Sequence, residues 1–339
     1  MSDLNKEFII SIEKNDIGKI KELISQNVEL KSFKIDYQLK IPLFTAIRKG
    51  NLKVIKLLLD KGADINIQDD SGNTALHIAV YENNPGIMKF LLDRGANPYI
   101  SNSDSAAPIH LAIDKNYQGK EFIEILCKKN FNLNIQNNCG FTPFSYALYH
   151  DKKGAMAVMV DYDINLNIQN VEGKTVLHFC RDMPASVIDL LLDLGGDLTI
   201  KDKYGNTPHH YIVNSYNFHA IDRFFENDSY INIQNDQGET PLNYFISNSH
   251  PSNTNILSFL LQKGADVNMP DIDGETPLFR ATYLNKNKFE EILKENGAKM
   301  YEINKEFNMK NISVESYHFI KEEVAQGENY ENENEYIFN

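Results

Sequence analysis

Gly72-Asn73-Thr74-Ala75-Leu76-His77-Ile78-Ala79 is the stretch of sequence that decides the fold, because it returns throughout the chain. Copies of its Thr-x-Leu-His core, of differing fidelity, begin at Ile41, Thr74, Ala107, Thr142, Thr175, Thr207, Thr240 and Thr276. Successive copies are separated by 33, 33, 35, 33, 32, 33 and 36 residues. A constant period of this length is the sequence signature of a stacked repeat architecture. We number the repeats one to eight from these positions.

The pattern Thr-Pro-Leu-His-x-Ala at this period resembles the ankyrin repeat. The better copies are Thr74-Ala75-Leu76-His77, Ala107-Pro108-Ile109-His110, Thr175-Val176-Leu177-His178, Thr207-Pro208-His209-His210 and Thr240-Pro241-Leu242-Asn243. The looser copies are Ile41-Pro42-Leu43-Phe44, Thr142-Pro143-Phe144-Ser145 and Thr276-Pro277-Leu278-Phe279. The resemblance covers residues 35 to 300 and implies an all-α solenoid, in which each repeat is a helix-turn-helix followed by a hairpin loop.

Each repeat carries start and stop signals for its two helices. The Thr can cap the first helix through its hydroxyl, and Pro follows at the first helical position. A Gly ends most second helices in the left-handed conformation that such an end requires. Asn130, Asp163 and Asp228 occupy this position in three repeats, and we expect them to adopt the same conformation.

The pattern divides the chain into four segments. Residues 1–35 contain two amphipathic stretches without the tetrapeptide, which predicts a pair of N-terminal capping helices. Residues 36–300 hold the eight repeats, and residues 301–326 are predicted to form a C-terminal capping segment, with one helix over Ser313 to Ala325. Residues 327–339 are acidic and poor in aliphatic side chains, which predicts a disordered tail.

Two repeats depart from the pattern at a position where helices pack closely. A small residue, Ala or Cys, stands three residues after the Leu position of the tetrapeptide in six repeats, whereas repeats six and seven have Ile212 and Phe245 there. Large side chains there should separate neighbouring helices. We therefore expect the stack to be least regular over residues 205–262.

Bulk composition restricts the kinds of partner. The net charge of −13 disfavours nucleic acid and anionic membrane surfaces. No apolar run approaches the roughly 20 residues that span a bilayer, and the first residues do not resemble a signal peptide. Three cysteines without a Cys-x-x-Cys pair argue against disulfides or a zinc module and suggest a reducing cytoplasm.

The sequence supplies no residue set for catalysis. His77, His110, His178 and His210 recur with the repeat, so each is expected to bond nearby backbone and to join hairpin to helix. Cys180 stands at the small buried position, and Cys139 has no evident base beside it. Phosphate-loop and nucleophile-elbow motifs are missing. We therefore expect no enzyme activity, no cofactor and no metal site.

The resemblance implies that protein partners bind a concave face, formed by hairpin tips and the ends of the first helices. Aromatic and apolar residues at such positions are enriched in interface cores. Acidic residues in repeats seven and eight would favour a basic partner segment. The predicted partner-binding residues are Tyr81, Phe141, Tyr149, His150, Val171, Met183, Tyr204, Asp236, Glu239, Asp273 and Glu275. Phe141, Tyr149, Met183 and Tyr204 are expected to lie along one concavity.

We accordingly predict a monomeric protein-protein interaction module. The Asn-, Ile- and Lys-rich composition is typical of AT-rich genomes, which suggests a secreted effector acting in a host cytoplasm as a further hypothesis. Two alternatives stay open. The repeats could recruit a substrate as an adaptor of an enzyme complex, or the chain could be a structural scaffold that associates with itself.

Overall fold

The computed structural model describes all residues except 1, 27, 36–37, 116–118, 227 and 300–339. The chain divides into two compact units, Met1–Val176 and Leu177–Asn339, and each is described by itself. The predicted capping segment 301–326 and the predicted tail 327–339 lie outside the described residues.

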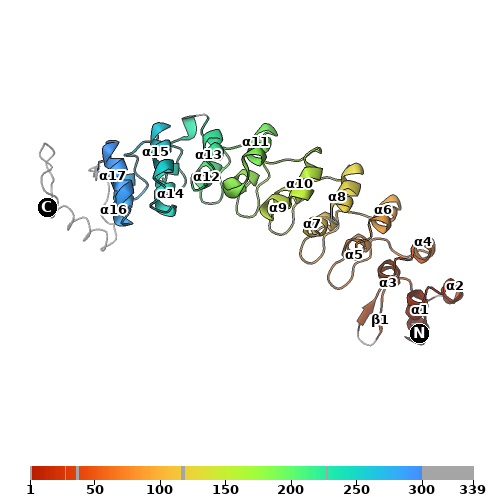
Figure 1. Cartoon of the computed structure of the whole chain (residues 1–339). Helices are drawn as coiled ribbons and strands as arrows, with labels where there is room; N and C mark the ends of the chain where they lie inside the picture. Colours follow the sequence, from red (N-terminus) through yellow and green to blue (C-terminus); the bar gives the residue numbers. More distant parts are fainter. Residues whose placement is uncertain (1, 27, 36–37, 116–118, 227, 300–339) are drawn as a thin grey trace, which may run out of the picture. The chain divides into compact units, whose positions relative to one another are not determined.

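The first unit is a series of short helices joined by hairpin loops, as Figure 1 shows. Its elements are α1 (Ser2–Glu13), α2 (Ile17–Ser25), β1 (Phe33–Ile35), β2 (Gln38–Lys40), α3 (Pro42–Arg48), α4 (Leu52–Asp60), α5 (Ala75–Tyr81), α6 (Pro85–Asp93), α7 (Pro108–Asp114), α8 (Gly119–Lys128), α9 (Pro143–Tyr149) and α10 (Lys153–Met159). The helices α1 and α2 occupy the stretch in which sequence periodicity predicts two helices. The strands β1 and β2 pair antiparallel, with Phe33 opposite Lys40, and the sequence did not predict them.

The second unit continues the same alternation of helices and loops. The 3-10 helix η2 (Val176–Asp182) begins at the last residue of the first unit. The further elements are α11 (Ala185–Asp193), α12 (Pro208–Ile212), α13 (Phe218–Phe224), the 3-10 helix η3 (Asp228–Tyr230), α14 (Pro241–Asn248), α15 (Thr254–Gln262), α16 (Pro277–Tyr283) and α17 (Asn287–Glu295). Within both units the helices are paired and stacked, which confirms the predicted all-α solenoid.

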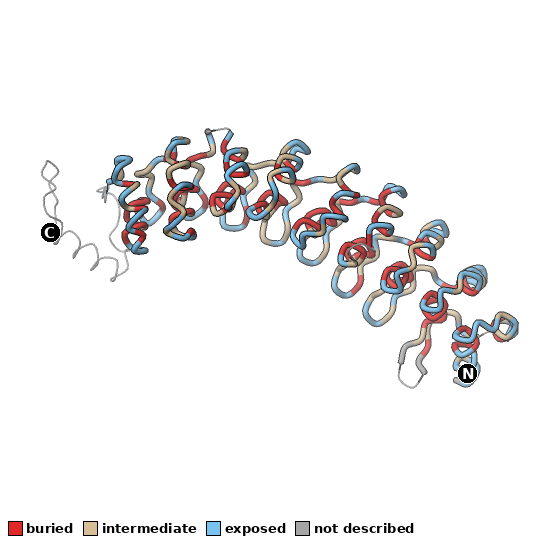
Figure 2. Tube along the Cα trace, viewed as in Figure 1, coloured by how far each residue is buried: buried red, intermediate tan, exposed pale blue. Residues whose placement is uncertain are grey.

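First helices pack on first helices and second helices on second helices. In the first unit α3 contacts α5, α5 contacts α7, and α7 contacts α9, while α6, α8 and α10 form the parallel row. In the second unit α12, α14 and α16 form one row, with α11 beside α13 and α15 beside α17 in the other. Buried residues gather on the first helices and on the facing sides of the second helices, while hairpin tips and outer turns are exposed (Figure 2).

Threonine caps begin most first helices as predicted. The hydroxyl oxygens of Thr142, Thr240 and Thr276 each accept the N–H of the residue three positions later. Each of these threonines has an extended backbone, and Pro follows at the first helical position. The motif therefore sets the start of these helices through a hydrogen bond and a fixed φ angle.

The predicted stand-ins for the terminal glycine behave in two ways. Asn130 adopts φ 54°, so it replaces glycine in the left-handed conformation. The predictions for Asp163 and Asp228 are wrong. Helix α10 ends at Met159 with Val160 as its right-handed C-cap, so Asp163 lies beyond the helix end. Asp228 begins η3.

The helices within residues 205–262 differ in regularity, while the expectation that their stacking is the least regular stays a prediction. Helix α12 has just 5 residues, but α14 and α15 are regular, with 8 and 9 residues. Phe245 is fully buried, and its ring stacks on Phe289 with centroids 5.6 Å apart. A second aromatic ring thus fills the space beside the large side chain. The clearest departure from an α-helix is η2, which lies outside the predicted range.

Candidate protein-binding surface

Side-chain hydrogen bonds hold some hairpins of the first unit to the next one along the chain. Gln68 Nε2 donates to Gly72 O at 2.7 Å and to Ser101 O, in the following repeat, at 3.3 Å. Gln136 Nε2 repeats this pattern with Gly140 O at 2.7 Å and Gln169 O at 2.9 Å. These bonds satisfy loop carbonyl groups and fix the hairpins relative to each other within the first unit.

The backbones of successive hairpin tips also bond directly. Ser103 N–H donates to Ser71 O at 2.8 Å, and Val171 N–H donates to Cys139 O at 3.1 Å. Gly140 permits the second contact, since a Cβ added there would lie 2.6 Å from Val171 N. The tips therefore form a surface whose geometry is set before any partner arrives.

The repeat histidines join the first helix of one repeat to the hairpin of the next. His77 Nε2 donates to Ala106 O at 2.9 Å, while its Nδ1 accepts the Thr74 N–H at 3.1 Å. His210 makes the same two bonds, to Glu239 O and from the Thr207 N–H. Burial lowers the pKa of both rings and keeps them neutral.

His110 lacks half of this arrangement. Its Nε2 donates to Phe141 O at 3.3 Å, but its buried Nδ1 has no hydrogen-bond partner. Ala107 stands where repeat two has Thr74, so it offers the ring no hydroxyl.

We expect Ala107→Thr to stabilise the protein by about 1 kcal/mol, because it adds a hydroxyl that can cap α7 and reach His110 Nδ1. Urea unfolding followed by circular dichroism measures this gain. The matched control is Thr74→Ala, which removes the same group from repeat two and should cost a similar free energy. A lower urea midpoint for Ala107→Thr would contradict the expectation.

The five predicted partner-binding residues of the first unit lie at hairpin tips or at the ends of first helices. Tyr81 and Tyr149 are the last residues of α5 and α9, and 43% and 54% of their surfaces are exposed. His150 follows α9 and is exposed, and Val171 at a tip is 66% exposed. Phe141 is half-buried. We call this region of hairpin tips and first-helix ends the tip surface.

Four rings of the tip surface form one continuous aromatic cluster: Phe141, Tyr146, Tyr149 and His150. Ring centroids lie 6.4 Å apart for Phe141 and Tyr146, and 4.4 Å apart for Tyr146 and His150. Tyr149 completes the cluster, because its ring centroid lies 5.1 Å from the centroids of both His150 and Phe141. The sequence analysis missed Tyr146, although it stands three and four residues before Tyr149 and His150, on the same side of a helix.

Tyr146 connects the aromatic cluster to an acidic side chain of the preceding repeat. Its hydroxyl donates to Asp114 Oδ2 at 3.0 Å. Burial, together with this carboxylate, raises the pKa of Tyr146 to about 12, so the hydroxyl stays protonated at neutral pH. Asp114 is the last residue of α7 and is exposed.

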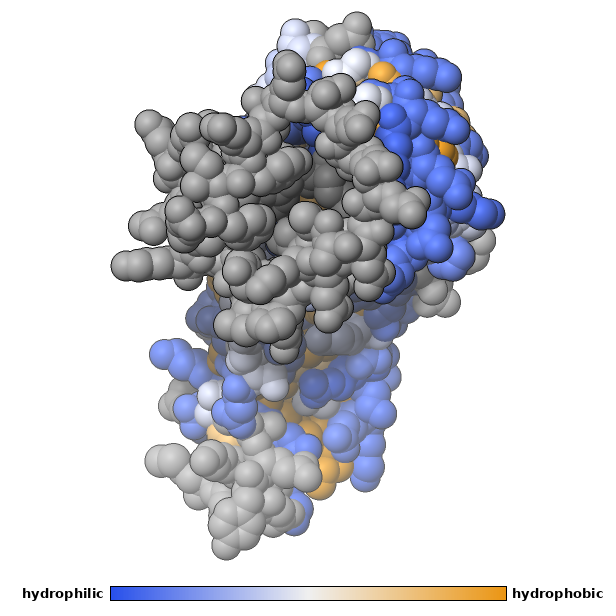
Figure 3. All heavy atoms as spheres, turned by 90° about the vertical axis from the view of Figure 1, so that its left-hand side faces the viewer, coloured by the Kyte–Doolittle hydropathy of each residue, from blue (hydrophilic) through white to orange (hydrophobic). Residues whose placement is uncertain are grey.

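The second unit carries the other six predicted residues. Tyr204 is 54% exposed at a hairpin tip, and the Lys203 ammonium lies 5.1 Å from the centre of its ring. Met183 is half-buried, and Asp236 and Asp273 are exposed at tips. The predicted common concavity joins residues of both units, so it stays a prediction. In the view of Figure 3, hydrophobic residues appear in limited groups between hydrophilic ones.

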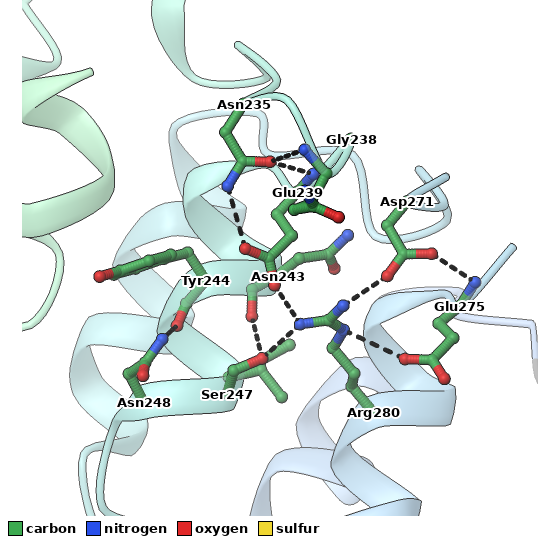
Figure 4. Close-up of polar contacts among 12 residues, drawn as sticks. Asn235, Gly238, Glu239, Asn243, Tyr244, Ser247, Asn248, Asp271, Glu275 and Arg280 are labelled. Atoms are coloured by element: carbon green, nitrogen blue, oxygen red, sulfur yellow. Dashed lines mark hydrogen bonds and ion pairs between the residues drawn. The ribbon is translucent and has the colours of Figure 1, made fainter. Parts of the chain in front are cut away.

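Two predicted members of the acidic flank are engaged inside the chain. Arg280 on α16 pairs with Glu239 and Asp271, and its Nε lies 3.6 Å from Glu275 Oε2 (Figure 4). The guanidinium also donates to Ser247 Oγ at 2.5 Å. Burial raises the pKa of Glu275 despite this cation. The sequence analysis treated four carboxylates of repeats seven and eight as open to a basic partner. In the structure two of them, Glu239 and Glu275, are already ion-paired with Arg280.

Comparison with known proteins identifies the repeat. The family model described as ankyrin repeats (3 copies) matches residues 8–102, 109–202, 177–268 and 209–304. The human transient receptor potential cation channel subfamily A member 1 is 28% identical over 288 residues, which are 80% of this chain and 22% of the channel. An ankyrin repeat protein of Rickettsia bellii is 40% identical over 77 residues, or 22% of this chain and 11% of that protein. The chain thus spans less than a quarter of either relative.

A solved structure shows the same fold. The ankyrin repeat domain of Bcl-3 superimposes with a TM-score of 0.56 at 20% sequence identity, covering 65% of this chain and 97% of that domain. At this identity the likeness concerns the fold alone. Over the part of the chain that the structure describes, every helix is too short or too polar to cross a membrane.

Proposed function

The chain belongs to the ankyrin repeat family, and we propose that it binds a protein partner through its tip surface and performs no catalysis itself. The observation that supports this most is the exposure of Tyr149, within the aromatic cluster, and of Val171, at the hairpin tip that bonds Cys139 O. Large apolar and aromatic side chains that are exposed to solvent are characteristic of interface anchors, and a few such anchors usually supply most of the affinity.

The hydrogen-bonded hairpins support a mechanism of rigid presentation. Bonds such as those of Gln136 and the contact between Val171 N–H and Cys139 O order the tips in the free protein. A surface that is ordered in advance loses little conformational entropy on binding, so more of the contact free energy appears as affinity. The exposed carboxylates at the tips favour a partner with a basic segment.

We expect Tyr149→Ser combined with Val171→Ser to weaken capture of the main protein partner at least about 30-fold, as loss of a 2 kcal/mol anchor would. The measurement is an affinity pull-down from a candidate cytosol with quantitative mass spectrometry. Both side chains are more than half exposed, so circular dichroism and melting should stay close to those of the unchanged chain. The matched control is Tyr216→Ser, which changes a 74% exposed tyrosine in the turn between α12 and α13 of the second unit. Undiminished capture by the double variant would refute the tip surface as the binding site.

The adaptor and scaffold alternatives are tested with the same material. A chain ending at Ala325 should retain a partner that the repeats bind, whereas loss of that partner would move recognition to the last residues of the sequence. Light scattering over a range of concentrations separates a monomeric binder from a scaffold that associates with itself. A more specific proposal is that the chain is a secreted effector that acts in a host cytoplasm. It requires the captured partner to be a host protein.

A further inference from the structure

The second helices of the first unit carry an excess of positive charge. We call α2, α4, α6 and α8 the outer helices, and they follow one another along the unit in Figure 1. Residues 16–26, 51–61, 84–94 and 119–129, which comprise these helices and their ends, hold ten Lys or Arg residues and six Asp or Glu residues. Their net charge is therefore +4, in a chain whose net charge is −13. The remaining residues carry −17, so the outer helices are the basic part of an acidic protein.

The segments beside the outer helices do not offset this excess. The adjoining turns and first-helix ends hold five cations and five acids: Lys14, Lys31, Arg48, Lys49 and Lys115 against Glu13, Glu29, Asp64, Glu82 and Asp114. The next second helix, α10, and its ends hold two of each: Lys152 and Lys153 against Asp151 and Asp161. The positive charge therefore stays with the outer helices.

Most acids of the outer helices are already paired with cations of the same surface. Asp60 pairs with Arg94 at 2.9 Å. Asp93 pairs with Lys129, which lowers the pKa of Asp93, with a smaller contribution from Lys89. Glu22 and Glu124 pair with lysines of their own helices. The carboxylate of Asp16 accepts the Lys19 N–H as the N-cap of α2, and Glu121 is exposed.

Five lysines of the outer helices form no ion pair within the part of the chain that the structure describes. All five are exposed: Lys21, Lys53, Lys56, Lys61 and Lys89. A pair of exposed charges contributes little by itself, but several pairs that form together can hold a ligand. These ammonium groups are thus available to carboxylates of another molecule.

Three of these lysines occupy the same position of consecutive helices. Lys21, Lys56 and Lys89 each follow the N-cap residue of their helix by five positions. We call these three residues the lysine row. Lys53 stands one turn before Lys56 on the same side of α4 and adds a fourth charge beside the row.

The helices that carry the lysine row are neighbours in space. Asn51 Nδ2, at the N-cap of α4, donates to Asn15 Oδ1, next to the start of α2, at 2.7 Å. Arg94 at the end of α6 reaches Asp60 on α4 at 2.9 Å. The row ends at α8, because the position that follows Lys89 by one repeat is Glu124, which pairs with Lys120 and Lys128. A ligand of the row thus crosses three helices.

The spacing of the row matches an extended peptide. The axes of neighbouring packed helices are about 10 Å apart. A polyproline II segment returns to the same side every third residue and rises about 3.1 Å per residue, or about 9 Å per turn. Carboxylates at every third residue can therefore meet the three lysines in succession. Duplex nucleic acid carries one charge per about 1.7 Å, so it would place many phosphates near the acidic remainder of the chain.

From these observations we propose that the lysine row binds an extended acidic segment of a protein partner, with Asp or Glu at every third residue. Three such residues span the row, so the recognised segment has seven residues. The row belongs to the outer helices, whereas the tip surface belongs to hairpins and first-helix ends. The proposal is therefore independent of the proposed function, and either can fail without the other.

The test uses the full chain and the blocked peptide Glu-Pro-Pro-Glu-Pro-Pro-Glu, which carries a fluorescent label and favours the polyproline II conformation. One matched peptide replaces each Glu by Gln, and another, Pro-Pro-Glu-Glu-Glu-Pro-Pro, gathers the three charges. Fluorescence anisotropy at low salt gives the affinities. We expect the Gln peptide to bind at least about tenfold more weakly and the gathered peptide at least about threefold more weakly. Affinity for the first peptide should fall as salt is raised to 0.2 M.

The triple variant Lys21→Gln, Lys56→Gln and Lys89→Gln should bind the spaced Glu peptide about tenfold more weakly or worse. All three side chains are exposed, so circular dichroism should not change. The matched control removes the same charge from three lysines that already lie near carboxylates: Lys120→Gln, Lys128→Gln and Lys153→Gln, whose side chains are 60%, 69% and 67% exposed. This control should lower the affinity less than about threefold. Equal effects of the two triple variants would overturn the proposal, and so would equal binding of the Gln peptide or of the gathered peptide.

Two other occupants of the lysine row are separated by the same assay. A full chain with Gln in place of Glu328, Glu331, Glu333 and Glu335 should bind the spaced peptide as the unchanged chain does. Binding that is tenfold tighter would show that these acidic residues of the chain itself occupy the row, which overturns a separate partner. Vesicles of phosphatidylserine and phosphatidylcholine test a membrane. If they sediment the chain through the lysine row while the peptide fails to bind, the ligand is an anionic lipid surface and the proposal is wrong.

Discussion

Acidification from pH 6.5 towards pH 4 is expected to unfold this protein, because its buried histidines must take up protons. Burial lowers the pKa of His110 and of His209 to about 4, while His77 and His210 are shifted in the same direction. A neutral ring suits these sites. In His77, for example, Nδ1 must accept the Thr74 N–H, which a protonated imidazole cannot do.

The sign of the effect follows from linkage. Between pH 6.5 and about 4 the unfolded chain binds more protons at these histidines than the folded chain does, so folding becomes less favourable as pH falls. The stabilising contribution is fully present above pH 6.5 and is lost progressively down to the folded pKa. A shift of this size corresponds to roughly 3 kcal/mol for each of His110 and His209. Two such losses approach the whole stability of a typical domain, about 5–15 kcal/mol.

Urea midpoints measured every half unit from pH 7.5 to 4.5 check this prediction. The variant His110→Gln keeps a side chain that can donate to Phe141 O but does not titrate. Its unfolding at acid pH should therefore take up about one proton fewer, and its free energy of unfolding should depend less on pH. The control is His250→Gln, because that ring lies exposed in a loop and bonds Ser252. Midpoints that stay constant between pH 7 and 5 would show that the buried rings do not control stability.

The tetrapeptide predicted most of the fold because its residues act locally. The cap by Thr142, the Pro after it and the left-handed Asn130 need only a few neighbouring residues, so the pattern specifies them without knowledge of the stack. Two elements were not predictable in this way. The pair β1 and β2 precedes repeat one, whose Ile41 lacks both the Thr and the preceding Gly. The element η2 has 7 residues, as α9 does, but it is a 3-10 helix, and the sequence gives no reason for this form.

The candidate site was predicted less well, because its decisive contacts cross between repeats. Tyr146 and Arg280 stand at the variable position after the tetrapeptide, where the repeat pattern sets no residue type. Tyr146 reaches Asp114, 32 residues earlier, and Arg280 reaches Glu239, 41 residues earlier. Such pairs depend on how neighbouring repeats stack. The exposure of Tyr149 and Val171 could be anticipated from the register, whereas the pairing of Glu239 could not.

Replacement of Arg280 by Met is expected to destabilise the second unit by about 3–5 kcal/mol, because it leaves buried carboxylates without their cation. Asp271 is only 2% exposed at its side chain and Glu239 only 16%. Asp271 Oδ1 also accepts the N–H groups of Asp273 and Glu275, so the acid cannot turn to water without breaking the hairpin. Loss of Arg280 alone therefore lowers stability more than replacement of the whole ion-pair cluster by neutral side chains would.

The measurement is the free energy of unfolding from urea titration, with circular dichroism at neutral pH. A triple variant, Arg280→Met with Glu239→Gln and Asp271→Asn, removes the buried charges together and should recover most of the loss, because Asn retains an Oδ1 for the two hairpin N–H groups. Arg181→Met is the surface control. Arg181 is half exposed and lies 3.9 Å from an exposed Asp182 carboxylate, so its loss should change stability by less than about 0.5 kcal/mol. If Arg280→Met costs no more than Arg181→Met, the Arg280 cluster holds no buried charge that needs pairing, and Glu239 and Glu275 return to the acidic flank available to a basic partner.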